Sequence, residues 1–347
     1  MTTSNPVHSK TGNGAAPARG NEGIYERGTV EIQDETVGYE LYAVDARSNR
    51  QREHDTRRGR PDGNIIVVVP GHGQSIHGPK KLVAAAALLS RSKIVWCIDP
   101  IPSLGGDRTE AQAIARVVEE MISTTFPAGG KSIAATLIGW SHGGSEALRA
   151  AECAPDLFPQ YLGLCPTGLV DRQPLELLHS FALEAARILW ASVRRRDWVC
   201  LKDTLRLGLN AGAGLVRDLW RSRSPRRLTE DVGWASRKVP GKRFGYSGEV
   251  VLLFGTLDTV VRWHDVLPEC DRPRDIPTYL GKYQEKNFPL AKRIEVQVVP
   301  GDHAAPEVDA ASFLQPGLGF LGQLDERGND RKQAGVYAPR SRAVVNK

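Results

Sequence analysis

The segment IAATLIGWSHGG, residues 133–144, decides the fold of this chain. Its first six residues are mostly apolar and predict a buried strand, which stops at Gly139. Trp140, Ser141 and His142 follow, and two more glycines come directly after them. A plain loop between a strand and a helix needs one glycine at most. Glycines on both sides of Ser141 therefore predict a turn so tight that side chains there would collide.

Strand and helix patterns alternate along the chain on both sides of this turn. Continuous apolar runs predict buried strands, and segments with apolar residues at helical spacing lie between them. The expected strands are two within residues 28–44, then 65–69, 93–98, 134–138, 161–165, 249–254 and 294–299. The expected helices include 80–89, 109–126 and 145–154. This order predicts an α/β fold, a mostly parallel, doubly wound sheet with helices on both faces.

Composition along the chain predicts five regions. Residues 1–23 and 325–347 are polar and aperiodic, so we expect disordered tails. The core is expected in two parts, 24–170 and 246–324, with a helical cap inserted at 171–245. Residues 45–64, DARSNRQREHDTRRGRPDGN, are expected to form a charged loop that is too polar to pack.

Three polar residues follow expected strands in the order serine, aspartate, histidine. In parallel α/β sheets, ligands bind beyond the carboxyl ends of the strands, where Ser141, Asp258 and His303 would all lie. A serine hydroxyl becomes a good nucleophile when a histidine takes its proton and a carboxylate orients that histidine. Asp265 and Asp271 are weaker candidates for the carboxylate, because neither directly follows a strand.

These residues carry a resemblance to a known superfamily. GWSHG, residues 139–143, resembles the nucleophile elbow of the α/β-hydrolases. LLFGTLDTVV, residues 252–261, resembles the turn that bears their acid, and VVPGDH, residues 298–303, resembles the turn that bears their histidine. The resemblance covers roughly residues 28–321 and implies an α/β-hydrolase fold with a catalytic triad of Ser141, Asp258 and His303.

The resemblance also implies an oxyanion hole made of two backbone N–H groups. The matching positions are His142, directly after the serine, and His72 in the segment VVVPGHGQS. The position of His72 is open by one or two residues, and its side chain is also a candidate for the pocket wall. Trp140 inside the elbow is expected to pack rather than to contact substrate.

The implied activity is that of a serine hydrolase acting on a small-molecule carboxylic ester or thioester through an acyl-enzyme, with no cofactor and no metal. Acyl transfer, thioester cleavage and C–C bond hydrolysis are alternatives on the same scaffold, and a non-catalytic binding protein is a further one. The sequence GLGFLG, residues 317–322, matches a dinucleotide-binding pattern. It lies well past the last expected strand, so we expect no dinucleotide there.

Charge, cysteine content and the N-terminal sequence indicate which partners and which cellular compartment to expect. The net charge of +6 is modest for 347 residues, and we expect no nucleic-acid partner. The five cysteines show no paired spacing, which is typical of reduced thiols. The N-terminal residues contain no apolar signal segment, so we expect a cytoplasmic protein.

The expected cap is unusually basic. Residues 171–245 hold 16 Lys and Arg against 8 Asp and Glu, a balance of +8, which leaves −2 for the remainder of the chain. Four of the seven tryptophans also lie here, at positions 190, 198, 220 and 234. One interpretation is an ordinary solvated surface. The other is that Arg194, Arg195 and Arg196, together with the arginines of residues 221–227, meet an acidic carrier protein, an anionic membrane surface or a charged substrate.

Overall fold

A computed structural model of the chain describes residues 23–33, 35–71, 79–100, 107–127, 133–169, 173–196 and 243–325, together with 198, 201, 202, 205 and 209. The expected tails, apart from residues 23 and 325, lie outside this described part, as do residues 210–242 of the expected cap.

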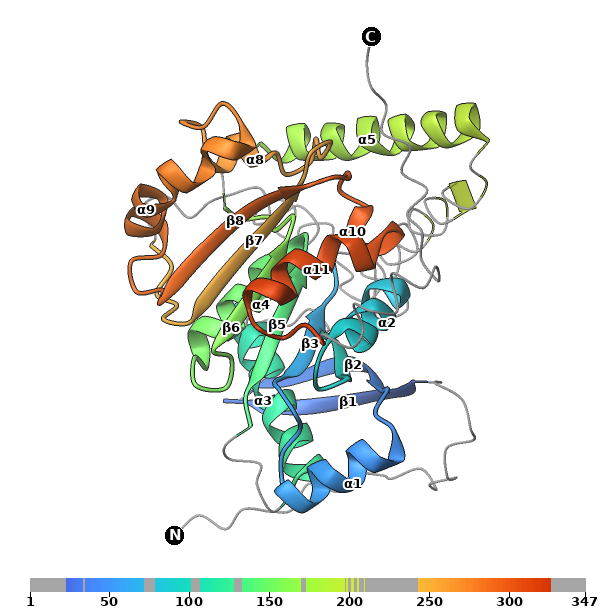
Figure 1. Cartoon of the computed structure of the whole chain (residues 1–347), viewed down its shortest axis with the longest axis vertical. Coiled ribbons are helices and arrows are strands. Elements are labelled where there is room, and N and C mark those ends of the chain that lie inside the picture. Colours follow the sequence, from blue (N-terminus) through green and yellow to red (C-terminus); the bar gives the residue numbers. More distant parts are fainter. Residues whose placement is uncertain are drawn as a thin grey trace.

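The described residues form one eight-stranded sheet (Figure 1). Its strands are β1 (Ile24–Ile32), β2 (Glu35–Asp45), β3 (Ile65–Val69), β4 (Ile94–Pro100), β5 (Ala135–Trp140), β6 (Gln160–Leu164), β7 (Glu249–Gly255) and β8 (Arg293–Val299). They lie in the order β1-β2-β4-β3-β5-β6-β7-β8, with β1 and β2 antiparallel and the other six strands parallel. The predicted fold class is confirmed.

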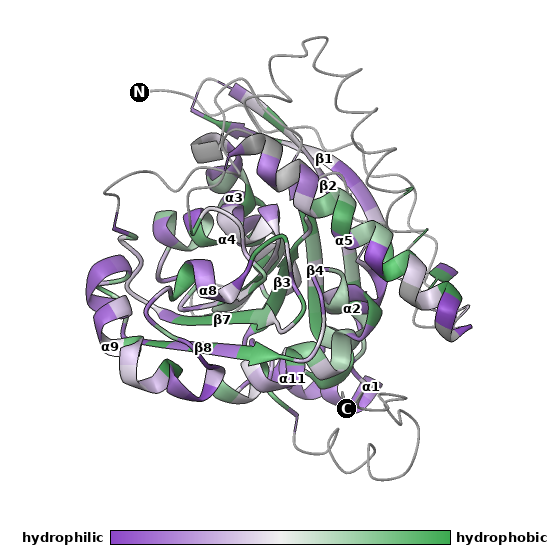
Figure 2. Cartoon of the chain, turned by 90° about the horizontal axis from the view of Figure 1, so that it is seen from above, coloured by the Kyte–Doolittle hydropathy of each residue, from purple (hydrophilic) through white to green (hydrophobic). Residues whose placement is uncertain are grey.

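Helices cover both faces of the sheet (Figure 2). They are α1 (Asn49–Arg58), α2 (Lys80–Leu89), α3 (Asp107–Thr125), α4 (His142–Cys153), α5 (Pro174–Arg195), α8 (Trp263–Val266), α9 (Ile276–Asn287), α10 (Ala305–Val308) and α11 (Ala310–Phe320). Helix α3 packs with α4, and α2 packs with α10 and α11. The central strands β3 and β5 are buried at every residue, because helices cover both of their faces.

The strand order places a topological switch at the centre of the sheet. After β3 the chain forms β4 on one side of it, and then crosses to form β5 on the other side. Connections leave in opposite directions at such a point and open a crevice beyond the carboxyl ends of the strands. The serine of the GWSHGG segment follows β5 and therefore lies at this crevice.

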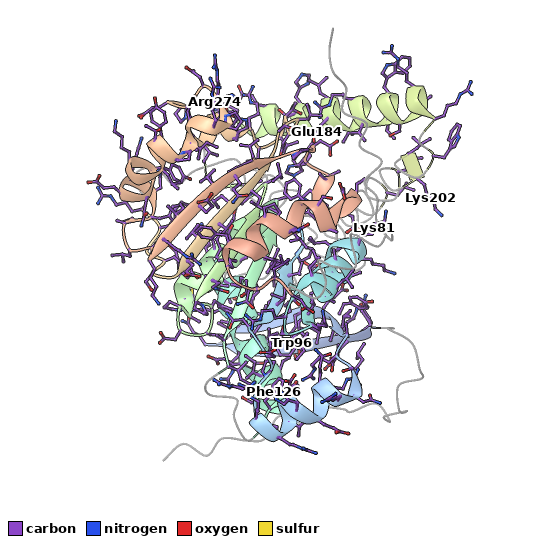
Figure 3. The ribbon with its side chains drawn as sticks, viewed as in Figure 1. Lys81, Trp96, Phe126, Glu184, Lys202 and Arg274 are labelled. Atoms are coloured by element: carbon purple, nitrogen blue, oxygen red, sulfur yellow. The ribbon has the colours of Figure 1, made fainter. Side chains whose placement is uncertain are left out.

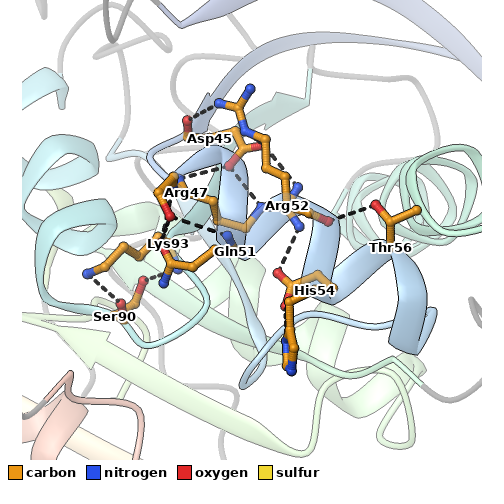
Figure 4. A network of polar contacts seen from close by, with 10 residues as sticks. Asp45, Arg47, Gln51, Arg52, His54, Thr56, Ser90 and Lys93 are labelled. Atoms are coloured by element: carbon orange, nitrogen blue, oxygen red, sulfur yellow. Dashed lines mark hydrogen bonds and ion pairs between the residues drawn. The ribbon is translucent and has the colours of Figure 1, made fainter.

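The expectation of a loop across residues 45–64 was wrong, because Asn49–Arg58 is helix α1. Ser48 and Gln51 form a reciprocal capping box at its start, and Gly59 ends it in a left-handed conformation with φ 66°. Arg47 then pairs with Asp45 at 2.9 Å (Figure 4). It also pairs with Asp55 of α1 at 2.9 Å. Caps and ion pairs stabilise this helix in place of the apolar face that the sequence lacks.

Helix α5 begins the segment expected to be a cap and runs across the molecule beyond the ends of β7 and β8 (Figure 1). Its apolar side chains are not all covered, since Trp190 is 71% exposed. Within the described residues, we find no helix that combines the length and the apolar character needed to cross a bilayer.

Candidate active site

Ser141 occupies a strained corner between β5 and α4. Its backbone angles, φ 55° and ψ −121°, lie in a region that residues other than glycine rarely adopt. Such a conformation costs about 1–3 kcal/mol of conformational energy. Hydrogen bonds hold the corner in place: the Ser141 N–H donates to Leu164 O at 3.0 Å, and its carbonyl accepts from the N–H groups of Gly144 and Thr167 at 3.0 Å each. The corner directs the serine hydroxyl beyond the end of the sheet.

The glycines of the segment are needed for close backbone contact. A Cβ atom at Gly139 would lie 2.5 Å from Gly143 O, and one at Gly143 would lie 2.1 Å from Pro70 O at the end of β3. A Cβ atom at Gly144 would lie 2.5 Å from the Cβ of Pro166. The glycines therefore let α4 begin directly against the ends of β3 and β5, as the sequence pattern predicted.

The structure brings Ser141, His303 and Asp258 together. His303 Nε2 lies 2.9 Å from Ser141 Oγ, and His303 Nδ1 lies 3.0 Å from Asp258 Oδ2. Ser141 follows β5, Asp258 follows β7 and His303 follows β8. Each of the three is no more than 7% exposed. In this geometry the imidazole can accept a proton from the hydroxyl, and the carboxylate can orient the imidazole and stabilise its positive charge.

The carboxylate of Asp258 is held by its own turn, the acid turn (residues 256–261). Its Oδ1 accepts from the N–H groups of Val260 and Val261 at 2.8 Å each, which leaves Oδ2 for His303. The thiol of Cys165, directly after β6, adds a further hydrogen bond to the carboxylate. The sequence pattern gave this cysteine no role at the site.

The electrostatics favour a charged pair of Asp258 and His303. Burial lowers the pKa of His303, but the charge and hydrogen bond of Asp258, together with Glu184 and Asp302, raise it to a net value above the ordinary 6.5. Burial raises the pKa of Asp258, but the charge and hydrogen bond of His303 lower it to a net value below the ordinary 3.8. Both shifts reflect an environment that favours a charged Asp258 beside a protonated His303.

Two further residues hold the histidine turn (residues 300–304). Trp140 Nε1 donates to His303 O at 3.1 Å, and Glu184 on α5 accepts from the His303 N–H at 2.5 Å. Trp140 is 4% exposed, so the structure assigns it to packing and to this hydrogen bond. Glu184 lies on the side of α5 that faces the sheet (Figure 3). No signal in the sequence identified Glu184, because it lies within a helix and not directly after a strand.

The remaining candidates from the sequence are placed as follows. His142 is the first residue of α4, so its N–H lies at the start of the helix, directly after Ser141. His72 lies outside the described residues. Asp265 pairs with Arg262 at 3.1 Å, whereas Asp258 pairs with the histidine. The glycines of GLGFLG lie in and just after α11, which follows α10, so the pattern does not join a strand to a helix.

One set of potential metal ligands overlaps the relay. In the described part of the chain, Cys165, Asp258 and His303 each offer one donor atom, and these atoms lie within 4.8 Å of one another. A metal would require the thiolate. Burial and the charge of Asp258 raise the pKa of Cys165 well above its ordinary value, and the thiol is hydrogen-bonded to Asp258. The Asp258 and His303 atoms already share a hydrogen bond, and the set fits a proton relay better than a metal centre.

The arrangement of sheet and turns defines the fold class. A parallel sheet with its switch between β3 and β5 places a strained serine elbow directly after β5. The aspartate and histidine turns follow β7 and β8 on the same edge. The chain therefore has the α/β-hydrolase fold.

Comparison with known proteins supports this assignment of the fold. No family model and no curated protein matches the chain. The structure is similar to that of a thermophilic esterase from Thermogutta terrifontis with malate bound, with a TM-score of 0.52 and 12% identity over 86% of this chain and 98% of that one. It is also similar to an α/β-hydrolase fold protein from Chitinophaga pinensis, with a TM-score of 0.53 and 11% identity over 87% of this chain and 99% of that one. At these identities the likeness concerns the fold alone.

Proposed function

We propose that this protein is a serine hydrolase that cleaves a carboxylic ester or thioester through an acyl-enzyme intermediate. The observation that carries the proposal is the relay in which His303 contacts Ser141 Oγ at 2.9 Å and Asp258 Oδ2 at 3.0 Å. The esterase from Thermogutta terrifontis, to which the fold is similar, agrees with this reaction class.

The first half-reaction acylates Ser141. His303 Nε2 takes the proton of the serine hydroxyl while Oγ attacks the carbonyl carbon of the substrate. Asp258 stabilises the imidazolium through its hydrogen bond to Nδ1. The tetrahedral intermediate then collapses, the bond to the leaving group breaks, and His303 returns the proton to the departing alcohol or thiol.

The second half-reaction releases the acid. His303 takes a proton from water, and the resulting hydroxide attacks the carbonyl carbon of the acyl-serine. Collapse of this second intermediate breaks the bond to Oγ, which recovers its proton from His303. The chemistry is complete with these side chains and water, so the proposal includes no cofactor.

The developing oxyanion needs donors that are already in position. We assign one to the backbone N–H of His142 at the start of α4, where the helix dipole adds positive potential. The second is assigned to the backbone N–H at His72, which lies outside the described residues. Removing one such donor typically costs about 10²–10³-fold in kcat.

The same relay would also serve acyl transfer or C–C bond hydrolysis, and a non-catalytic binding protein is the remaining alternative. These alternatives differ in what accepts the acyl group and in whether the serine reacts at all. A panel of p-nitrophenyl esters with increasing acyl length, run with and without an added alcohol or thiol acceptor, separates hydrolysis from acyl transfer and from a serine that does not react.

We expect time-dependent release of p-nitrophenol by the wild type and a loss of about 10³-fold or more in Ser141→Ala, because triad members act as a unit. Preferential formation of a transfer product would identify an acyltransferase. Activity retained within a few-fold in Ser141→Ala would contradict the proposal.

A further inference from the structure

Glu184 is a buried carboxylate on α5 that contacts both turns of the relay. It is 3% exposed, although it lies on a helix whose neighbouring residues are largely exposed. Its Oε1 accepts from the His303 N–H at 2.5 Å. Its Oε2 accepts from Thr259 N at 2.7 Å and from Thr259 Oγ1 at 2.6 Å. One side chain therefore joins the acid turn, the histidine turn and α5.

The contacts of Glu184 complete the support of the two turns. Asp258 is held from its own turn by Val260 and Val261, while the next residue, Thr259, is held by Glu184. The peptide groups on either side of His303 are also fixed, with its carbonyl bound to Trp140 and its N–H bound to Glu184. The Glu184 carboxylate thus joins the two turns, in addition to the backbone hydrogen bond from the Leu257 N–H to Gly301 O at 2.8 Å.

Two neighbours of Glu184 on the same face of α5 also contact these turns. Phe181 meets the His303 ring edge-on, with ring centroids 5.2 Å apart. Arg187 donates to Leu257 O at 2.6 Å. Residues 181, 184 and 187 are spaced three apart and so share one side of the helix. This side of α5 therefore contacts both the acid turn and the histidine turn.

We propose that Glu184 is a positioning residue for the triad, which aligns His303 with Asp258 and adds negative charge beside the imidazole when His303 takes the serine proton. The proposal rests on the hydrolase function proposed above. A residue that only anchored α5 would change the stability of the protein, but it would leave the titration of His303 unaltered.

The charge of Glu184 gives the proposal a second readout. The charged or titratable groups around His303 are Asp258 from the acid turn, Asp302 from its own turn and Glu184 from α5, with Cys165 beside Asp258 and Arg187 acting on Asp302. Glu184 raises the pKa of His303. Removing the charge of Glu184 should therefore lower the pKa of His303. Because His303 must be neutral to accept the proton, the acid limb of the kcat/KM profile should then move to lower pH.

The test compares Glu184→Gln with two matched variants. Glu176→Gln makes the same change at an exposed position in the first turn of α5. Trp140→Phe removes a hydrogen bond to the same histidine peptide without changing a charge. For each variant, kcat and kcat/KM on a p-nitrophenyl ester are measured against pH, and the His303 ring is titrated by NMR on ¹⁵N-histidine-labelled protein. The His303 signal is assigned by its loss in His303→Ala.

We expect Glu184→Gln to lower kcat by about 10-fold or more, since small misplacements of catalytic groups cost up to about 10²-fold. Its His303 titration and its acid limb should both move to lower pH. Trp140→Phe should lower kcat without that move, and Glu176→Gln should behave as wild type. If Glu184→Gln does not fold, Glu184→Asp, which keeps the charge and shortens the reach, should keep the titration and lose kcat.

Wild-type kcat and His303 titration in folded Glu184→Gln, or a lower melting temperature alone, would overturn the proposal. Wild-type behaviour of Glu184→Asp would do the same if Glu184→Gln does not fold. If the wild type hydrolyses no ester, the proposed function fails, and the NMR titration still decides whether Glu184 acts on His303.

Discussion

Gly143→Ala tests whether the elbow needs its close contact with the end of β3. Alanine is favoured over glycine inside a helix by about 1 kcal/mol, so the substitution would stabilise α4 if there were space for it. There is none, because the new Cβ would lie 2.1 Å from Pro70 O and 2.5 Å from Val69 O. Both atoms belong to the backbone and cannot rotate away.

The size of the effect follows from these distances. Ordinary van der Waals contact begins at 3.4 Å, so Pro70 or the start of α4 must move by more than 1 Å. Forcing extra atoms into a packed site costs about 1–3 kcal/mol. Each kcal/mol lowers the Tm by about 2–4 °C in a domain of 150–250 residues, and by less in a longer chain. The same movement displaces Ser141 from His303 and should lower kcat by about 10²-fold.

Gly281→Ala is the matched control. It also adds one methyl group to a helical glycine, in α9, but no atom lies within 4 Å of the new Cβ. It should stabilise the protein by about 0.5–1 kcal/mol and leave kcat unchanged. Thermal melts and p-nitrophenyl ester hydrolysis are measured on both variants. Gly143→Ala that is as stable and as active as Gly281→Ala would refute the reasoning.

Three further predictions follow from the relay and from the basic segment. Asp258→Asn should lower kcat by about 10²–10⁴-fold by stabilising the wrong imidazole tautomer; a near-normal Asp258→Asn with an inactive Asp265→Asn would transfer the acid role to Asp265. The kcat/KM of the wild type should fall as the pH drops through the pKa of His303, with a midpoint above the ordinary 6.5. A midpoint below 6.5 in the pH–rate profile would contradict the charge assignment. Replacing Arg194, Arg195 and Arg196 with Gln should weaken co-sedimentation with anionic vesicles while leaving ester hydrolysis unchanged, since each basic residue contributes about 1 kcal/mol near such a surface; binding that does not depend on salt would return these arginines to ordinary solvated surface.

The fold, and the meeting of Ser141, Asp258 and His303 at one edge of the sheet, could be predicted because their signals are local. Buried parallel strands have continuous apolar sequences, as in Ile65–Val69. The carboxyl ends of parallel strands share one edge, so residues that directly follow strands meet there even when they are far apart in the chain. Ser141 and His303 are 162 residues apart and still lie in contact.

The support of the relay could not be predicted in the same way. Glu184 is one of several charged residues on a helix, and its partner His303 is 119 residues away. Its role depends on which side of α5 faces the turns, and this cannot be inferred from the residue types in the helix. Helix α1 was missed for a different reason: its stability comes from the Ser48 capping box and the ion pairs of Arg47 rather than from an apolar face.

The central claim is that Ser141 is a nucleophile activated by His303. The most direct measurement is labelling of the native protein with a fluorophosphonate, followed by intact-mass analysis and peptide mapping. Attack by Oγ displaces fluoride and leaves a phosphonyl group on the serine. We expect one adduct per wild-type chain, on the peptide that contains Ser141, and none on Ser141→Ala or on the denatured wild type. An unlabelled native wild type, or equal labelling of Ser141→Ala, would contradict the account.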